Sequence, residues 1–144
     1  MSYAIIRNRK LTKGKTTGAY VHNERKAKNH SNKNIDPTRT HLNYYIKKNN
    51  GTYVEEFKRI KEEQDLKGQI KTTSNITNEM IITSDPAFFN SISYEESQKY
   101  FREAYNCISQ YKGLGAENII TALVHMDERN TSYASDICTC NSHR

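Results

Sequence analysis

A histidine and an arginine lie three residues apart in the first quarter of the chain. A helix would place His22 and Arg25 on one face, because residues three apart are neighbours on a helix surface. A histidine can attack or contact a phosphate, while the planar guanidinium of arginine holds two phosphate oxygens. Taken alone, such a pair on a charged helix is more often a solvated surface than a site.

A second candidate site follows a short apolar stretch near the other end of the sequence. Residues 122–124 (Ala-Leu-Val) have the character of a buried strand that delivers His125, Asp127 and Glu128 to its end. Imidazole and carboxylate groups are metal ligands and proton carriers. The stretch therefore predicts a place where metal or proton chemistry could be done.

The elements that must position these residues can be outlined from periodicity and capping signals. Two long amphipathic helices are predicted, one of them opened by the capping box of Ser93 and Glu96. The two long helices are expected at 53–67 and 94–111. The other expected elements are a first strand at 2–10, a mobile basic loop at 13–18, a helix at 19–28, a strand at 80–83, a short helix after Pro86 and a strand at 118–124. Strands and helices alternate without regular βαβ spacing, so we expect an α+β domain with a mainly antiparallel sheet.

Composition limits the classes of function. The 144 residues suffice for one domain, and the formal charge of +6 is concentrated between residues 7 and 48. A basic N-terminal third is typical of a polyanion partner such as nucleic acid, although charge alone fits a merely solvated surface equally well. No apolar run is long enough to cross a membrane, and three cysteines do not make a secreted disulfide framework, so we expect a cytoplasmic protein with no membrane partner.

Three segments in order resemble one known family. These are Ser2-Tyr3 with His22-Asn-Glu-Arg25, then His41-Leu-Asn-Tyr44, then His125-Met-Asp-Glu128. Together they closely resemble the Mob/Pre (MobV-type) family of plasmid mobilisation and recombination relaxases, which belong to the His-hydrophobe-His endonucleases. The resemblance covers residues 1–128, and the order and spacing of the motifs make it specific. It implies an N-terminal relaxase domain that nicks and rejoins one strand of plasmid DNA at a transfer origin, single-stranded or in a hairpin.

The resemblance also implies roles for individual residues. His125 matches the first of three metal-binding histidines, and the metal, Mn2+ or Mg2+, polarises the scissile phosphate. Glu128 matches the acidic residue that moves protons. His22 matches the favoured nucleophile, which would join covalently to the 5′ end, and Arg25 steadies it or the phosphate. Tyr44 is the competing nucleophile, since related relaxases use tyrosine.

The DNA-binding residues that we expect come from the basic third and from the motifs. They are Lys13, Lys15, Arg25, Lys26 and Asn43. One departure is evident in the second motif, where Tyr45 stands at a position that is usually acidic in the family. The sequence does not indicate an oligomeric state.

The last sixteen residues, 129–144, do not continue the family pattern. The family has x-Thr-Pro-His-x-His and an apolar strand after Glu128, whereas this chain reads Arg-Asn-Thr-Ser-Tyr-Ala-Ser-Asp. A reading frame shifted by one nucleotide permits Glu-Thr-Pro-His-Met-His and an apolar strand. We therefore expect an out-of-frame, poorly ordered tail ending prematurely at Arg144, and a fold that lacks its final strand.

The consequence of such a tail is the loss of two of three metal histidines. We expect weak or absent metal binding and inefficient nicking, with a non-catalytic basic DNA-binding module as the alternative. The tail residues Cys138, Cys140 and His143 superficially suggest zinc, but they leave a tetrahedral ion one protein ligand short.

Overall fold

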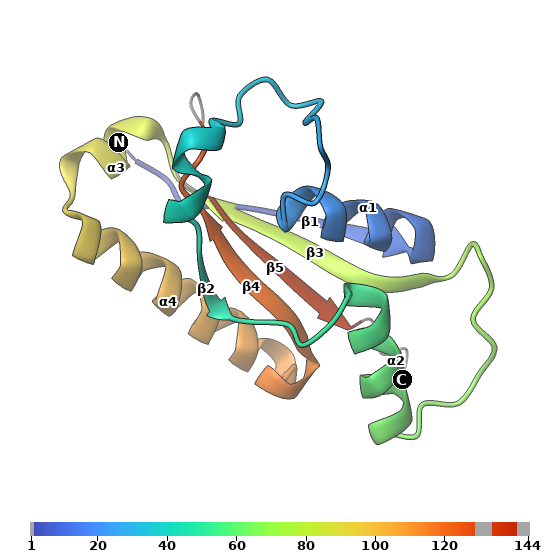
Figure 1. Cartoon of the computed structure of the whole chain (residues 1–144). Coiled ribbons are helices and arrows are strands. Elements are labelled where there is room, and N and C mark those ends of the chain that lie inside the picture. The colour runs from blue at the N-terminus through green and yellow to red at the C-terminus, as the bar shows by residue number, and fades with distance from the viewer. Residues whose placement is uncertain (1, 129–133, 141–144) are drawn as a thin grey trace.

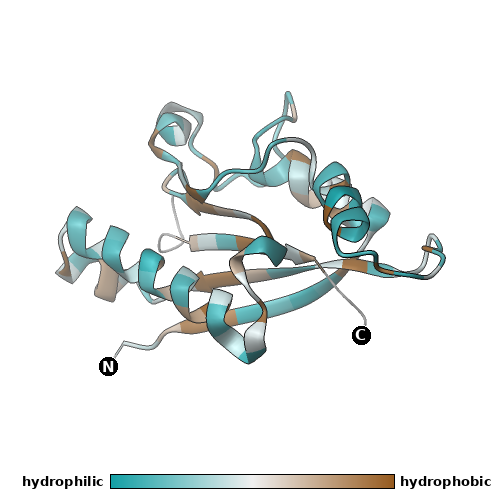
Figure 2. Ribbon diagram, turned by 90° about the horizontal axis from the view of Figure 1, so that it is seen from below, coloured by the Kyte–Doolittle hydropathy of each residue, from teal (hydrophilic) through white to brown (hydrophobic). Residues whose placement is uncertain are grey.

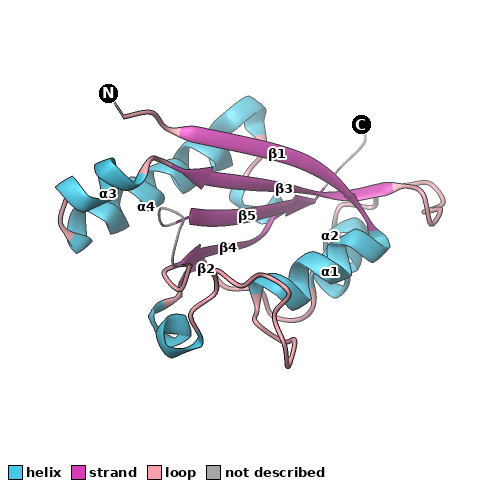
Figure 3. Ribbon diagram, turned by 90° about the horizontal axis from the view of Figure 1, so that it is seen from above, coloured by secondary structure: helices cyan, strands magenta, loops and turns pink. Residues whose placement is uncertain are grey.

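The computed structural model describes residues 2–128 and 134–140, which form an antiparallel sheet with helices packed on both faces (Figure 1). The strands are β1 (Ile5–Thr12), β2 (Tyr44–Lys47), β3 (Asn75–Thr83), β4 (Ile119–His125) and β5 (Ala134–Cys140). Their spatial order is β1-β3-β5-β4-β2, so the last strand in the sequence lies at the centre of the sheet (Figure 3). Every pairing is antiparallel, which confirms the predicted fold class.

The α-helices are α1 (Lys13–Asn23), α2 (Tyr53–Glu63), α3 (Pro86–Ser91) and α4 (Tyr94–Gln110). Short 3-10 helices lie at Pro37–Leu42, Tyr111–Gly113 and Ala116–Asn118. Figure 2 shows hydrophobic residues along the strands, while much of the outer surface of the helices is hydrophilic. In the part of the chain that the structure describes, no helix is long and apolar enough to cross a membrane.

The two faces of the sheet can be assigned from neighbouring residues of β5. Cys138 packs with Tyr53 and Phe57 of α2, whereas Ile137 packs with Ile108 of α4. Successive side chains of a strand point to opposite faces, so α2 and α4 cover opposite sides. We call these the α2 face and the α4 face. The helix α1 also lies on the α2 face, where its Tyr20 contacts the Tyr53 ring edge to face.

Local sequence signals explain where the longer helices begin. Thr52 and Glu55 form a reciprocal capping box at the start of α2, as Ser93 and Glu96 do at the start of α4. Asp85 accepts a hydrogen bond from the backbone of Phe88, and Pro at the next position begins α3. These caps confirm the predicted starts of the helices.

The expectation that the fold lacks its final strand is wrong. Residues Ala134–Cys140 form β5, which pairs with β3 on one side and β4 on the other. The physical reason is that Ile137 and Cys138, at 0% and 1% exposure, fill the cores on opposite faces of the sheet. Part of the predicted disordered tail is therefore ordered. Residues 129–133 and 141–144 lie outside the described residues, and the out-of-frame origin of the segment remains a prediction.

The expected mobile loop at 13–18 is also wrong, because α1 begins at Lys13 and ends at Asn23 rather than spanning 19–28. Thr16 and Ala19 are buried on one side of the helix. The Thr16 hydroxyl contacts the Thr77 hydroxyl of β3 at 2.8 Å. This packing against the sheet overrides the weak helix propensity of the glycines in the segment.

Candidate functional site

A left-handed residue ends α1 and turns the chain toward the sheet. Arg25 has a φ of 53°, and the amide of Lys26 donates to the Val21 carbonyl at 2.9 Å. This arrangement resembles a Schellman helix end, whose left-handed position usually holds glycine. Such a backbone conformation costs a non-glycine residue about 1 kcal/mol or more, so the side chain of Arg25 must offset it.

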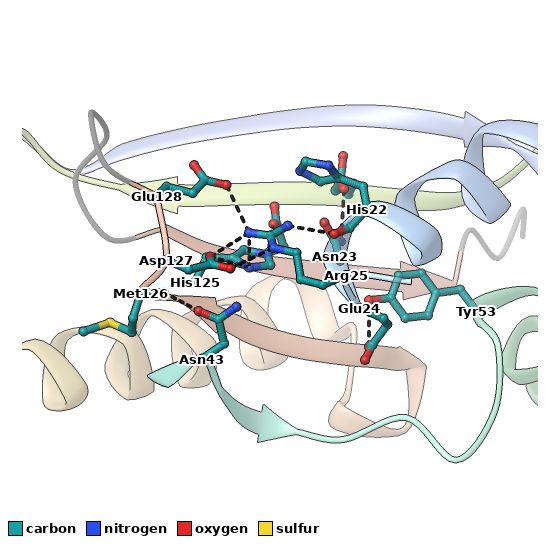
Figure 4. Close-up of polar contacts among 12 residues, drawn as sticks. His22, Asn23, Glu24, Arg25, Asn43, Tyr53, His125, Met126, Asp127 and Glu128 are labelled. Carbon is teal, nitrogen blue, oxygen red and sulfur yellow. Dashed lines mark hydrogen bonds and ion pairs between the residues drawn. The ribbon is translucent and has the colours of Figure 1, made fainter. Parts of the chain in front are cut away.

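The Arg25 guanidinium reaches the residues that follow β4 (Figure 4). Its Nε and Nη2 donate to the two carboxylate oxygens of Asp127 at 2.9 and 2.7 Å, and Nη2 lies 3.5 Å from Glu128 Oε1. The Nη1 atom donates to the His22 carbonyl at 2.7 Å. The side chains of Arg25 and Asp127 are only 6% and 0% exposed, so this is a buried, bidentate ion pair.

Burial and pairing act in opposite directions on Asp127. Burial alone would raise the pKa of its carboxyl, but the hydrogen bonds and charge of Arg25, with the Thr40 hydroxyl at 2.9 Å, lower the pKa to about 2. Asp127 is therefore ionised at neutral pH and serves to hold Arg25. Asp127 was part of the predicted motif, but the sequence assigned it no partner.

His125 lies buried at the end of β4 between a cation and a carboxylate. Its Nδ1 is 3.1 Å from Arg25 Nη2, and its Nε2 is 2.7 Å from Asp136 Oδ2 of β5. The contact between Nε2 and Asp136 does not have hydrogen-bond geometry, and Nε2 has no other hydrogen-bond partner among the described residues. Asp136 was missed from the sequence because its strand was expected to be absent, and nothing in the local sequence identifies it.

His22 remains solvent-accessible at the end of α1, above these groups. Partial burial, and then the positive charges of Arg25 and His125, lower the pKa of the imidazole below its usual 6.5, against the opposing pull of Asp136 and Glu128. The ring is therefore largely neutral at pH 7, and a neutral ring nitrogen has the lone pair that a nucleophile needs.

Tyr44 does not lie beside His22, Arg25 and His125. It lies opposite Val124 on β4 and packs with the cluster of Phe101 and Met126 on the α4 face, while the adjacent His125 points to the other side. Burial raises the pKa of its phenol to about 12, so it is not ionised at neutral pH. Tyr44 therefore lies on the opposite side of the sheet from His125, whereas His22 lies on the same side as His125.

The predicted DNA-binding residues are spread over the α2 face. The Asn43 side chain accepts a hydrogen bond from the Met126 amide at 2.7 Å, so it holds the end of β4. Lys26 is exposed one residue after Arg25. Lys13 and Lys15 are exposed at the other end of α1, which is roughly 13 Å and roughly 10 Å along the helix from His22 at about 1.5 Å per residue. Of these lysines, Lys26 lies nearest in the sequence to His22 and Arg25.

The residues present do not fit a three-histidine metal site. Among residues 2–128 and 134–140, no group of three or more histidine, cysteine or acidic side chains is arranged to hold a metal ion. His125, the predicted ligand, has the guanidinium of Arg25 against one ring nitrogen, and that charge repels a second cation. Its other ring nitrogen faces Asp136.

The cysteines of β5 do not offer a zinc site either. Cys138 and Cys140 pack in the core beneath α2, and burial raises the pKa of their thiols to about 12 and about 11. A zinc ligand must be a thiolate, which this apolar setting disfavours. His143 lies outside the described residues.

Comparisons with known proteins agree with the fold and the motifs. The family model Mob_Pre, described as plasmid recombination enzyme, matches residues 1–141. A plasmid recombination enzyme of Streptococcus agalactiae is 36% identical over 131 residues, which are 89% of this chain and 26% of the relative. Another, from Lactiplantibacillus plantarum, is 38% identical over 133 residues, 90% of this chain and 36% of the relative. The chain thus spans about a third or less of these relatives.

A solved structure shares the fold over almost the whole chain. It is the MobM relaxase domain bound to plasmid pMV158 oriT DNA, with Mn bound, and it is 32% identical with a TM-score of 0.85 over 95% of this chain and 69% of that chain. A second crystal structure of that complex gives a TM-score of 0.83 at 31% identity. The sequence, the antiparallel sheet and the clustered motifs together show that this chain belongs to the Mob_Pre family of plasmid recombination enzymes.

Proposed function

We propose that this chain binds plasmid transfer-origin DNA and cleaves it inefficiently. The observation that carries the proposal is the convergence of Arg25 with His125 and Glu128, 100 and 103 residues away in the chain. The resemblance predicted that these residues belong to one site. The MobM relaxase domain, which has the same fold, is bound to oriT DNA in its crystal structures.

The reaction that we assign to this site is a transesterification at a backbone phosphate. A neutral ring nitrogen of His22 attacks phosphorus and forms an N–P bond to the phosphate at the 5′ end of the downstream segment of the strand. The P–O3′ bond breaks, and the departing 3′ oxygen takes up a proton, for which Glu128 is the carrier that we assign. Rejoining reverses these steps, and the bond energy is conserved in the covalent intermediate.

Inefficient cleavage follows from the cations at the site. Phosphoryl transfer depends on positive groups that stabilise the charge developing on the phosphate oxygens. Arg25 already donates its hydrogen bonds to Asp127 and the His22 carbonyl, and the described residues contain no complete set of metal ligands. Lys26, next to Arg25 in the sequence, is exposed and could contact the phosphate. Its single flexible ammonium group is a weak substitute for a metal ion or a guanidinium in stabilising the charge on the phosphate oxygens.

Incubating the purified chain with supercoiled plasmid that carries a cognate origin, in the presence of Mn2+, tests this proposal. We expect origin binding in a gel shift with only slow conversion to open circles, and we expect the His22→Ala variant to lose that slow conversion while it keeps origin binding. Robust, His22-dependent nicking would show that the site is complete. Absence of any DNA binding would contradict the proposal altogether.

A non-catalytic DNA-binding module is the second candidate, favoured by the net charge of +6 and by exposed lysines along α1. Binding through phosphate contacts alone falls steeply as salt rises and does not distinguish sequences. Equal affinity for origin and unrelated DNA would favour this candidate.

We also propose that the segment after Glu128 is a frameshifted form of the family sequence, fused to a relaxase domain at residues 1–128. The support is that the shifted frame permits Pro-His-Met-His where the family has its histidine pair. The coding DNA over residues 128–141 decides the matter, because codons incompatible with that string would exclude the frameshift.

A further inference from the structure

The three residues that follow His22 are tied to four different parts of the fold. Asn23 is buried, and its Nδ2 donates to Glu79 of β3 at 3.4 Å. Arg25 binds Asp127 beyond β4. Glu24, between them, reaches strand β2 and helix α2. His22 therefore stands at a helix end whose following three side chains are all anchored.

The Glu24 carboxylate accepts hydrogen bonds from two tyrosine hydroxyls, and Figure 4 shows the one from Tyr53. Tyr45 of β2 donates to Oε2 in a short hydrogen bond, and Tyr53 of α2 donates to Oε1 at 3.3 Å. Tyr53 is fully buried, and its hydroxyl depends on nearby polar groups of the α1 end. One carboxylate thus joins the end of α1 to two other elements.

The hydrogen bond to Glu24 gives Tyr45 a structural role. The family resemblance places an acidic residue at this position, and a second carboxylate would repel Glu24. A tyrosine instead donates a hydrogen bond to the charged oxygen, which is a stronger bond than one between neutral groups. The change from an acid to tyrosine therefore converts a potential repulsion into an attachment.

We propose that Glu24 is a positioning residue for His22, and that Tyr45 and Tyr53 hold it. The proposal rests on the proposed function only in giving His22 its role toward a phosphate. The amide of Glu24 closes the last turn of α1 on the Tyr20 carbonyl at 2.9 Å, so its side chain and backbone fix the same turn. Releasing the carboxylate frees the turn, and the imidazole of His22 moves away from Arg25 and His125.

Variants Glu24→Gln and Tyr45→Phe test this, with Glu62→Gln as the matched control on the exposed side of α2. The first readout is the NMR signal of the His22 ring, with those of His30 and His41 as internal references. We expect the His22 signal alone to shift and broaden in both variants, because a general loss of stability would not select one native-state ring.

The second readout is hydrogen exchange of the Lys26 amide, which bonds the Val21 carbonyl and closes the helix end. We expect exchange to quicken about tenfold in each variant, as for the loss of one charge-assisted hydrogen bond, while β3 and β4 amides remain unchanged. The double variant should exchange more slowly than the two single effects combined would predict, because both changes weaken the same hydrogen bond: Tyr45→Phe removes its donor, and Glu24→Gln leaves a neutral acceptor.

An unchanged His22 signal and unchanged Lys26 exchange would overturn the proposal, as would fully additive effects in the double variant. If Glu24→Gln does not fold, Tyr45→Phe alone carries the test, because it removes a single hydroxyl. Neither readout requires DNA, so failure of the proposed function would leave this result interpretable.

Discussion

Replacing Arg25 with alanine removes the cation that joins α1 to the end of β4. The Asp127 carboxylate, with 0% of its side chain exposed, would keep the Thr40 hydroxyl but lose its charge partner. Removing one member of a buried ion pair costs about 3–5 kcal/mol, because the remaining charge stays desolvated. Alanine also inherits the left-handed backbone at this position, so no strain is relieved.

Urea unfolding of Arg25→Ala at neutral pH measures this loss. Arg59→Ala is the control, because Arg59 pairs with Glu56 and Glu63 from a side chain that is 44% exposed. Exposed pairs contribute about 0–1 kcal/mol, so the control should change little. The double variant Arg25→Ala/Asp127→Asn should recover part of the stability, since it removes the stranded charge. If Arg25→Ala costs no more than the control, the buried ion pair does not hold this site together.

Four further predictions concern the sheet and its two faces. In the native chain, iodoacetamide should modify the exposed Cys107 and leave the buried Cys138 and Cys140 unmodified, which mass spectrometry can show. Equal labelling of all three cysteines would contradict the burial of β5 in the sheet. Burial raises the pKa of these two thiols above the unfolded value, so their stabilising contribution is present below about pH 8.5. It is lost as pH rises toward 11 and 12, and unfolding midpoints measured along that range should fall. Ile137→Ala should lower the free energy of unfolding by about 2–5 kcal/mol, because the side chain is 0% exposed between β3, β4 and α4; a loss below about 1 kcal/mol in urea would contradict the central position of β5. Tyr44→Phe should leave DNA binding unchanged in a gel shift, because the hydroxyl faces the α4 side; a large loss would restore Tyr44 as a site residue.

Strong local signals made several helices predictable. The capping box at Ser93 and the proline after Asp85 act within one turn of the chain, so the sequence suffices to locate the helices that they begin. The strand before His125 was predictable for a similar reason, as a short apolar run ending in polar residues. These signals depend on neighbours in the sequence rather than on the rest of the fold.

The strand β5 was not predictable in the same way. Its residues are mostly small or polar, and Asp136 and Thr139 interrupt any apolar alternation. Burial at the centre of a sheet, with β3 and β4 on either side, makes this segment a strand.

In the candidate site too, some residues could be predicted from local motifs, and others depend on the packing of distant segments. His22, Arg25, His125 and Glu128 were found through their motifs, and the structure brings Arg25 into contact with the other three. Partners supplied by other elements were missed, because the pairing of Glu24 with Tyr45 and of His125 with Asp136 depends on the packing of distant segments.

In the function that we propose, the residues around His22 and Arg25 bind transfer-origin DNA. The most direct measurement is fluorescence anisotropy of a cognate origin hairpin against a scrambled hairpin of equal length, over a range of salt concentrations. We expect at least a roughly hundredfold preference for the origin near physiological salt, below the widest specificity ratios because the described residues contain no complete set of metal ligands. Equal affinity for the two hairpins, vanishing together as salt rises, would contradict it.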